Sequence, residues 1–286
     1  MPELPEVETI KNDLKKVILH KKITDIAIHK EKQIKNKSIP DFRNEIINHS
    51  FSAISRIGKL IYIRLSNKNY LLIHLKMTGQ LIYQKKHQKI AGGHNFPPVK
   101  LLPNKYSHVI FSFDDHSQLF FNDQRQFGYL KLVTPPQLKL IKKTYGIEPL
   151  QPDFTLKNFQ QIFTGKKTTI KNILLNQSLV SGLGNIYVDE ICFDAQIRPQ
   201  TKAEKLTLSK IKKLYFSTEK IIKQAIRYRG TTFSDYVDSK GTKGNYSIKL
   251  KVYGRTGEKC YTCKKQPIKK IKINGRGTHF CPRCQK

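Results

Sequence analysis

Cys260-Tyr261-Thr262-Cys263 and Cys281-Pro282-Arg283-Cys284 are two Cys-x-x-Cys pairs, and 17 residues separate them. This spacing is typical of a zinc site. Four thiolates can surround one zinc ion tetrahedrally and leave no position for water, so the pattern predicts one structural zinc ion with no catalytic role. The alternatives to zinc are a redox-active cysteine pair or chance spacing.

The residues between the two cysteine pairs predict a β-hairpin. Residues 267–273 are strand-like, Asn274-Gly275 favours a type I′ turn, and residues 278–280 return toward the second pair. Arg276 follows the turn, where its forked guanidinium suits contact with a phosphate. The alternative for Arg276 is an ordinary exposed side chain.

The charge of the chain agrees with a polyanionic partner. Across 286 residues, 53 Lys and Arg oppose 21 Asp and Glu, which gives a net charge of +32. A solvated, Lys-rich surface is the alternative explanation. The hydrophobic content of 38% excludes a disordered basic tail, and no apolar run is long enough for a membrane helix. The acidic start Met1–Glu6 differs from a secretion signal, so we expect a cytoplasmic protein.

The hydrophobic pattern predicts an α+β fold with several domains. Residues 6–19 have helical spacing, and residues 23–134 show short alternating strands that favour an antiparallel β-sandwich. Within that region we expect a long surface loop at 85–105. The predicted organisation is a first domain at 1–134, a linker at 135–150, a helical domain at 151–240 with helices at 155–163, 168–177, 185–195 and 207–228, and the zinc hairpin at 241–286.

The first residues form a candidate reactive centre. Removal of Met1 before a small residue would leave Pro2 with a free secondary amine, whose ordinary pKa is about 8. Such an amine is partly unprotonated at neutral pH and can attack a sugar carbon to form an iminium. Glu3, Glu6 and Glu8 lie close by, although acids in a first helical turn are also favoured by the helix dipole alone.

The chain resembles the bacterial formamidopyrimidine-DNA glycosylase family from end to end. The motifs that carry the resemblance are Met1-Pro2-Glu3-Leu4-Pro5-Glu6-Val7-Glu8-Thr9, Ile57-Gly58-Lys59, His74-Leu75-Lys76-Met77-Thr78-Gly79, Arg125-Gln126-Phe127-Gly128, Glu148-Pro149-Leu150, Gly182-Leu183-Gly184-Asn185-Ile186-Tyr187, Val252-Tyr253-Gly254-Arg255 and Gly275-Arg276-Gly277-Thr278. The resemblance implies an N-terminal β-sandwich domain, a helix-two-turn-helix DNA-binding domain and the zinc hairpin. It also implies a monomeric, nucleoid-associated bacterial enzyme that excises oxidised purines from double-stranded DNA and cleaves the strand.

The resemblance implies roles for individual residues. Pro2 would form the Schiff base and Glu3 would supply an acid, while Lys59 would act in β-elimination and Arg276 in δ-elimination. The implied phosphate contacts are His108, Arg125, Lys167 and Asn185. Asn185 would begin a helix after a Gly-rich turn, where backbone N–H groups favour anions.

The resemblance also implies a wedge and a mobile loop. Met77, Arg125 and Phe127 would fill the gap left by a flipped nucleotide, although Met77 and Phe127 also suit core packing. The loop from Gly230 to Gly244 would be a lesion-recognition lid. Gln124 and Gln126 depart from the family pattern beside the wedge.

Two other functions fit part of the sequence. An endonuclease VIII-like enzyme for oxidised pyrimidines would share the reactive amine. A non-enzymatic, zinc-dependent nucleic-acid-binding protein would account for the charge and the hairpin, but it leaves Pro2 and Glu3 unexplained.

Overall fold

The computed structural model describes residues 1–86, 88–93, 101–231 and 246–286. Contacts divide the chain into unit 1, residues 1–143 and 228–245, and unit 2, residues 144–227 and 246–286. Apart from Gly230 and Thr231, the predicted lesion-recognition loop lies outside the described residues. None of the described helices combines the length and apolar character needed to span a bilayer.

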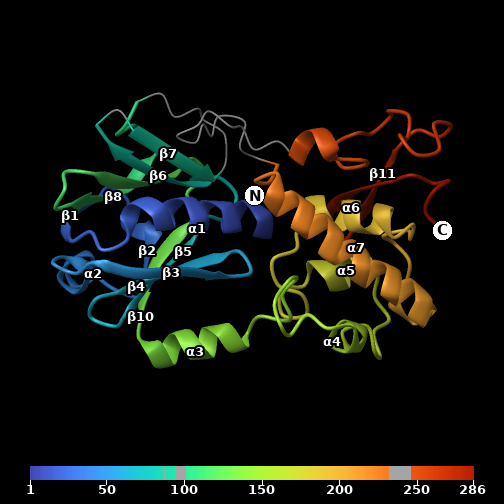
Figure 1. Cartoon of the computed structure of the whole chain (residues 1–286), viewed down its shortest axis with the longest axis horizontal. Helices are drawn as coiled ribbons and strands as arrows, with labels where there is room; N and C mark the ends of the chain where they lie inside the picture. The colour runs from blue at the N-terminus through green and yellow to red at the C-terminus, as the bar shows by residue number, and fades with distance from the viewer. Residues whose placement is uncertain (87, 94–100, 232–245) are drawn as a thin grey trace. The chain divides into compact units, whose positions relative to one another are not determined.

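Unit 1 contains the two sheets of a β-sandwich, which confirms the predicted fold class (Figure 1). The first sheet has the order β1-β8-β9-β6-β7 and is antiparallel throughout. The second has the order β2-β10-β5-β4-β3, with a short parallel pairing between β10 and β2. The strands are β1 (Ile23–Ile28), β2 (Ile34–Lys35), β3 (Phe51–Ile57), β4 (Leu60–Leu65), β5 (Tyr70–His74), β6 (Gly79–Lys85), β7 (Gln88–Gly93), β8 (Ser107–Phe113), β9 (Gln118–Asp123) and β10 (Tyr129–Val133).

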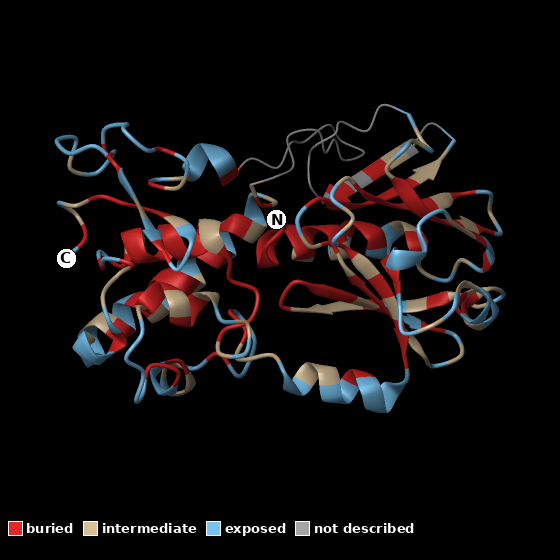
Figure 2. Cartoon of the chain, turned by 180° about the vertical axis from the view of Figure 1, so that it is seen from behind, coloured by how far each residue is buried: buried red, intermediate tan, exposed pale blue. Residues whose placement is uncertain are grey.

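Helix α1 (Leu4–Ile18) packs against both sheets, on β6 and β7 of the first and on β3 and β4 of the second. Its apolar side chains, among them Val7, Ile10 and Leu14, belong to the same buried core as the inner faces of the sheets. Figure 2 colours most of this helix as buried. The amphipathic spacing therefore predicted this helix and its buried face correctly. Its position at the core fixes the start of the chain on unit 1.

Three segments of unit 1 differ from the sequence expectations. Residues 88–93, expected in a surface loop, form β7 in register with β6, from Gln80↔Gly93 to Lys85↔Gln88. This strand is Gly-rich, and Ile90 is its only long apolar residue, so it lacks the alternation of apolar and polar residues that predicts a strand. It forms because its backbone pairs with β6. Helix α2 (Ile39–Ile46) interrupts the region expected to hold only strands, and α3 (Pro135–Lys143) occupies part of the expected linker.

Unit 2 contains the predicted helices, each close to its expected bounds. They are α4 (Leu156–Gln161), α5 (Ile170–Leu175), α6 (Asn185–Asp194) and α7 (Leu208–Arg227). The structure also has short 3-10 helices, η1 (Glu31–Gln33) in unit 1 and η2 (Ala203–Lys205) and η3 (Tyr246–Lys249) in unit 2. Thr155 and Thr169 cap α4 and α5 by accepting hydrogen bonds from Asn158 N and Asn172 N. Cys192 is fully buried on α6.

The C-terminal hairpin of unit 2 confirms the predicted turn. Strands β11 (Lys269–Ile273) and β12 (Arg276–Phe280) pair from Lys269↔Phe280 to Ile273↔Arg276. Asn274 and Gly275 have φ angles of +45° and +75°, the left-handed conformations that a type I′ turn requires. Arg276 is thereby exposed directly after the turn.

Candidate active site and nucleic-acid interface

The amino terminus is buried at the start of α1. Pro2 is buried, and Glu3 occupies the N-cap position with a side chain only 3% exposed. Glu3 and Glu6 form a capping box, in which Glu3 N donates to Glu6 Oε2 at 2.9 Å. Pro5 lies in the first turn, where its missing N–H costs nothing. The capping box and the proline at the start of α1 therefore hold Pro2 and Glu3 in a defined conformation.

Charged side chains surround the terminal amine. In the full chain this amine belongs to Met1, and it stands for the Pro2 nitrogen that becomes terminal when Met1 is removed. Burial lowers its pKa below the ordinary value, and the charges of Lys59 and Arg125 lower it further. Glu3 and Glu6 act in the opposite direction. A lowered pKa keeps more of the amine unprotonated and nucleophilic at neutral pH.

Lys59 is presented by the turn between β3 and β4. Ile57 pairs with Leu60, so Gly58 and Lys59 form the turn, and Gly58 has a left-handed φ of +53°. Lys59 is 6% exposed. Its charge acts on the terminal amine, so Lys59 contributes to the electrostatic environment of the amino terminus.

The predicted wedge residues are exposed on adjacent segments of unit 1. Met77 is 37% exposed and Phe127 is 54% exposed, which excludes core packing as their role. The Arg125 guanidinium lies 4.8 Å from the centre of the Phe127 ring. An arginine and two apolar side chains displayed in this way are suited to enter a base stack.

Asp123, which sequence reasoning missed, supports the wedge. It is fully buried and accepts hydrogen bonds from Thr78 Oγ1, from Arg125 N at 3.2 Å and from Gly128 N at 2.7 Å. It therefore joins the segment of Met77 to the segment of Arg125 and Phe127. A lone aspartate at the end of an apolar strand is the only sequence signal for it.

His108 and His74 lie on strands β8 and β5, where His108 is buried and His74 is half-buried. His108 is 1% exposed, and its Nε2 lies 2.7 Å from the Asp123 carbonyl oxygen. His74 Nδ1 accepts from Lys76 N at 3.0 Å. Burial lowers the pKa of His74 to about 3, and the charges of Lys76 and Lys59 contribute, so the ring is neutral at physiological pH.

In unit 2, a buried polar network connects the hairpin to α6 at the end where Asn185 lies. Asn185 Nδ2 and Lys171 Nζ both donate to the Gly277 carbonyl, at 3.0 and 3.2 Å. Lys171 also forms a buried ion pair with Asp189 at 2.6 Å, and Asp189 accepts from His279 N at 2.8 Å. The network places Asn185 beside Gly277, the neighbour of exposed Arg276. Lys167 is exposed on the loop before α5.

The four cysteines have a geometry that fits zinc. Their Sγ atoms all lie within 4.8 Å of one another. Cys260 and Cys284 are 3.8 Å apart, and Cys263 and Cys281 are 3.7 Å apart. A tetrahedral site with Zn–S bonds of about 2.3 Å requires sulfur atoms about 3.8 Å apart. The residues therefore suit one zinc ion, which would hold the hairpin and leave no position for a reactant.

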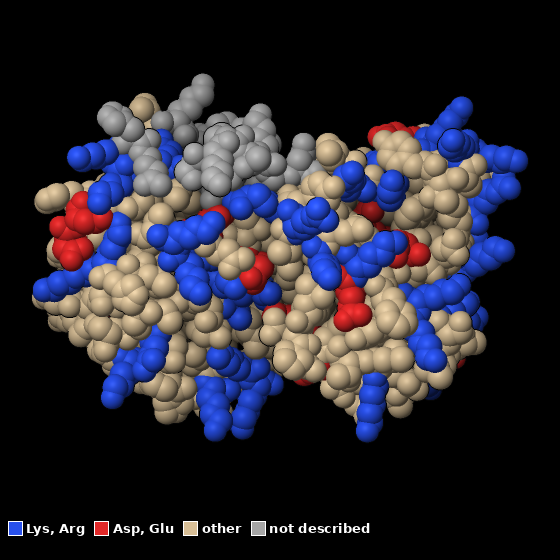
Figure 3. Space-filling model, in the orientation of Figure 1, with Lys and Arg blue, Asp and Glu red and all other residues tan. Residues whose placement is uncertain are grey.

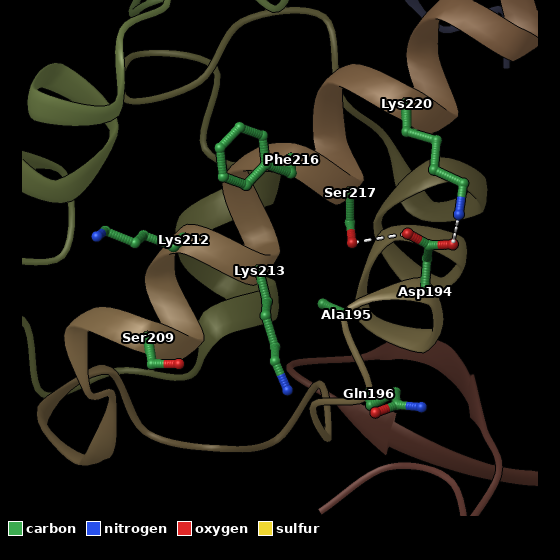
Figure 4. Close-up of a pocket in the computed structure, with 9 residues that line it drawn as sticks. All are labelled: Asp194, Ala195, Gln196, Ser209, Lys212, Lys213, Phe216, Ser217 and Lys220. Carbon is green, nitrogen blue, oxygen red and sulfur yellow. Dashed lines mark hydrogen bonds and ion pairs between the residues drawn. The ribbon is translucent and has the colours of Figure 1, made fainter.

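A hollow of about 390 Å³ lies between the end of α6 and one face of α7, away from the Asn185 end of α6 (Figure 4). Asp194 accepts from Ser217 Oγ at 2.8 Å and pairs with Lys220 at 2.6 Å. Lys212 and Phe216 line the hollow. None of the residues predicted to act on DNA lies in it.

Three family models match the chain in succession. They describe the formamidopyrimidine-DNA glycosylase N-terminal domain at residues 1–130, the formamidopyrimidine-DNA glycosylase H2TH domain at 145–237 and a zinc finger found in FPG and IleRS at 257–286. The chain belongs to the formamidopyrimidine-DNA glycosylase family. Formamidopyrimidine-DNA glycosylase of Listeria innocua is 40% identical, and that of Streptococcus mutans is 38% identical, each over the whole of both chains.

Solved structures of formamidopyrimidine-DNA glycosylases share the fold. Wild-type Lactococcus lactis Fpg (MutM), in complex with DNA containing N7-benzyl-Fapy-dG, has a TM-score of 0.87 and 34% identity over the whole of both chains. The complex of Lactococcus lactis Fpg with DNA containing an abasic site has a TM-score of 0.87 and 35% identity, and the match covers 99% of each chain. Family membership confirms the resemblance on which the site residues were predicted.

Proposed function

We propose that the protein is a bifunctional DNA glycosylase and AP lyase of base excision repair. It removes oxidised purines, including 8-oxoguanine and formamidopyrimidines, from double-stranded DNA and cleaves the strand by β,δ-elimination. The observation that carries the proposal is the buried amino terminus, where Glu3 and Lys59 act on an amine of lowered pKa. The Fapy-dG derivative in the DNA bound by the Lactococcus relative supports oxidised purines as the substrate class.

The chemistry begins at Pro2 after Met1 has been removed. The Pro2 nitrogen attacks C1′ of the damaged nucleoside, the bond from C1′ to the base breaks, and the amine proton ends on the departing base. The C1′–O4′ bond then breaks as the sugar opens, which leaves an iminium between C1′ and the Pro2 nitrogen. Glu3 is the acid that protonates the sugar oxygen and assists base loss, a role worth about 10²- to 10⁴-fold in rate. Lys59 assists removal of the C2′ proton in β-elimination, and Arg276 assists the following δ-elimination.

Other residues extrude the damaged base and bind the DNA backbone. Flipping a nucleotide costs a few kcal/mol, and Met77, Arg125 and Phe127 offset this by filling the gap. Lys167, Asn185 and Arg276 contact phosphates from unit 2. Because His108 is buried against Asp123, we assign its effect on DNA to support of the loop that carries Arg125.

We further propose that the protein acts as a monomer on DNA in the bacterial cytoplasm. Its net charge of +32 supports binding to the nucleoid through phosphate contacts.

Borohydride trapping tests the proposal. Zinc-loaded protein with Met1 removed is incubated with duplex DNA that carries 8-oxoguanine opposite cytosine, and a covalent protein-DNA adduct is expected. Pro2→Gly, which replaces the secondary amine by a primary one, should weaken or abolish strand cleavage. Absence of the adduct with wild-type protein would reject the enzyme and favour the non-enzymatic DNA-binding protein, whereas faster trapping on thymine glycol would favour an endonuclease VIII-like specificity.

A further inference from the structure

Arg56 is a buried cation between α1 and the turn that carries Lys59. Its side chain on β3 is only 5% exposed. Arg56 Nε donates to Glu8 Oε2 at 2.6 Å, and Arg56 Nη1 donates to the Gly58 carbonyl at 3.3 Å. One guanidinium therefore contacts both the helix that begins at the reactive end of the chain and the turn that presents Lys59.

Glu8 is held in place by its own helix. Its other oxygen, Oε1, accepts from Lys11 Nζ at 2.6 Å and from Asn12 Nδ2 at 3.1 Å. Burial raises the pKa of the Glu8 carboxyl, but the hydrogen bond from Lys11 and the charge of Arg56 outweigh this and leave the pKa below its usual value. Glu8 is therefore an ionised and oriented acceptor for Arg56.

The contact of Arg56 with the turn lies at its special backbone position. Gly58 adopts a left-handed conformation, and the hairpin register runs from Phe51↔Leu65 to Ile57↔Leu60, so the ladder ends at this turn. The bond from Arg56 to the Gly58 carbonyl holds the peptide that directly precedes Lys59. Movement of this peptide would move the Lys59 backbone with it.

We propose that Arg56 and Glu8 are positioning residues that hold Lys59 beside the terminal amine. Glu8 orients Arg56 from α1, and Arg56 fixes the Gly58-Lys59 peptide. In this role the pair acts through Lys59. This inference rests on the proposed function, because it assigns the support of that site.

A double-mutant cycle on DNA with a preformed abasic site tests this role. Single-turnover β-elimination is measured for wild type, Arg56→Gln, Lys59→Met and the double variant. Arg56→Gln should slow the reaction about tenfold when Lys59 is present and less than about twofold when Lys59 is Met. Equal losses in both backgrounds would show that Arg56 acts through general structure and would overturn the proposal.

Conservative variants separate positioning from folding. Glu8→Gln keeps the shape of the side chain, and its effect on the rate should depend on Lys59 in the same way. If circular dichroism shows that the Arg56→Gln variant is unfolded, Glu8→Gln takes its place in the cycle. Arg56→Lys keeps the charge but has one nitrogen in place of the fork, so we expect only partial recovery of the rate. A full recovery would show that charge alone suffices.

The matched control is Arg64→Gln. Arg64 is exposed on the neighbouring strand β4 and should leave the rate unchanged. A loss equal to that of Arg56→Gln would overturn the specific role of Arg56. If wild-type protein forms no adduct on abasic-site DNA, the proposed function itself fails, which is distinct from additive losses in an active enzyme.

Discussion

At the residue scale, the reactivity of the terminal amine depends on the charges that face it, which are Glu3, Glu6, Lys59 and Arg125. The reaction needs the unprotonated amine, so the rate falls as pH falls through the amine pKa. Because burial, Lys59 and Arg125 lower this pKa, the midpoint of the acid limb should lie below the ordinary value of about 8.

Lys59→Met removes one cation and should therefore move that midpoint to higher pH. The rate of borohydride trapping on abasic-site DNA, measured as a function of pH, provides the readout. A wild-type midpoint at or above the ordinary value, or a downward shift in the variant, would contradict the electrostatic account.

A second prediction at this scale concerns the ion pair of Lys171 and Asp189, whose side chains are 1% and 0% exposed. Asp189→Ala leaves a buried charge without its partner and should destabilise the protein by about 3–5 kcal/mol. Urea unfolding measures the change. Asp194→Ala is the control, because its partner Lys220 is 55% exposed and such a pair contributes about 1 kcal/mol or less. Similar effects of the two substitutions would refute the importance of burial.

At the element scale, the zinc hairpin depends on its metal and on α6. Two strands alone are marginally stable, and the described hairpin packs on few apolar residues, among them Val252 and Ile268. Zinc removal should therefore disorder the hairpin and displace Arg276, while the separate core of unit 1 keeps its fold.

Cys260→Ser should thus weaken binding to DNA with a stable abasic analogue by about 10- to 100-fold, with little change in circular dichroism of the strands. Fluorescence anisotropy gives the affinity, and Cys192→Ser, outside the metal cluster, tests for a general effect of losing a thiol. Undiminished affinity after chelation would count against the hairpin as a DNA-gripping element.

At the scale of the whole molecule, the net charge of +32 is distributed widely, and Lys and Arg are abundant on the visible face of both units (Figure 3). Binding to undamaged duplex should weaken linearly on a plot of log affinity against log salt. Only cations that meet phosphates contribute to this slope. The plot therefore separates functional cations from solvated ones.

Arg276→Gln should reduce the salt slope by about 1, whereas Lys212→Gln, in the hollow at the other end of α6, should leave it unchanged. Titrations at several salt concentrations provide the comparison. Equal slopes for the two variants would mean that the basic surface binds DNA without a defined face.

The sequence by itself determined the features that depend on neighbouring residues. Cysteine spacing specified the metal cluster, Asn274-Gly275 specified the turn, and helical periodicity specified α1 and α4 to α7. The amino-terminal motif pointed to Pro2 and Glu3 through its resemblance to the glycosylase family, and the helix start that holds these residues is itself a local structure. These features need no knowledge of distant partners.

Only the tertiary structure decided the features that depend on long-range contacts. Strand β7 forms because β6 offers an edge, and Met77 and Phe127 are exposed because Asp123 holds their segments at the surface. Likewise, Arg56 meets Glu8 across 48 residues of sequence. Such pairs leave no local pattern, since a charged residue on a strand or helix has the same sequence signature whether it faces water or a buried partner.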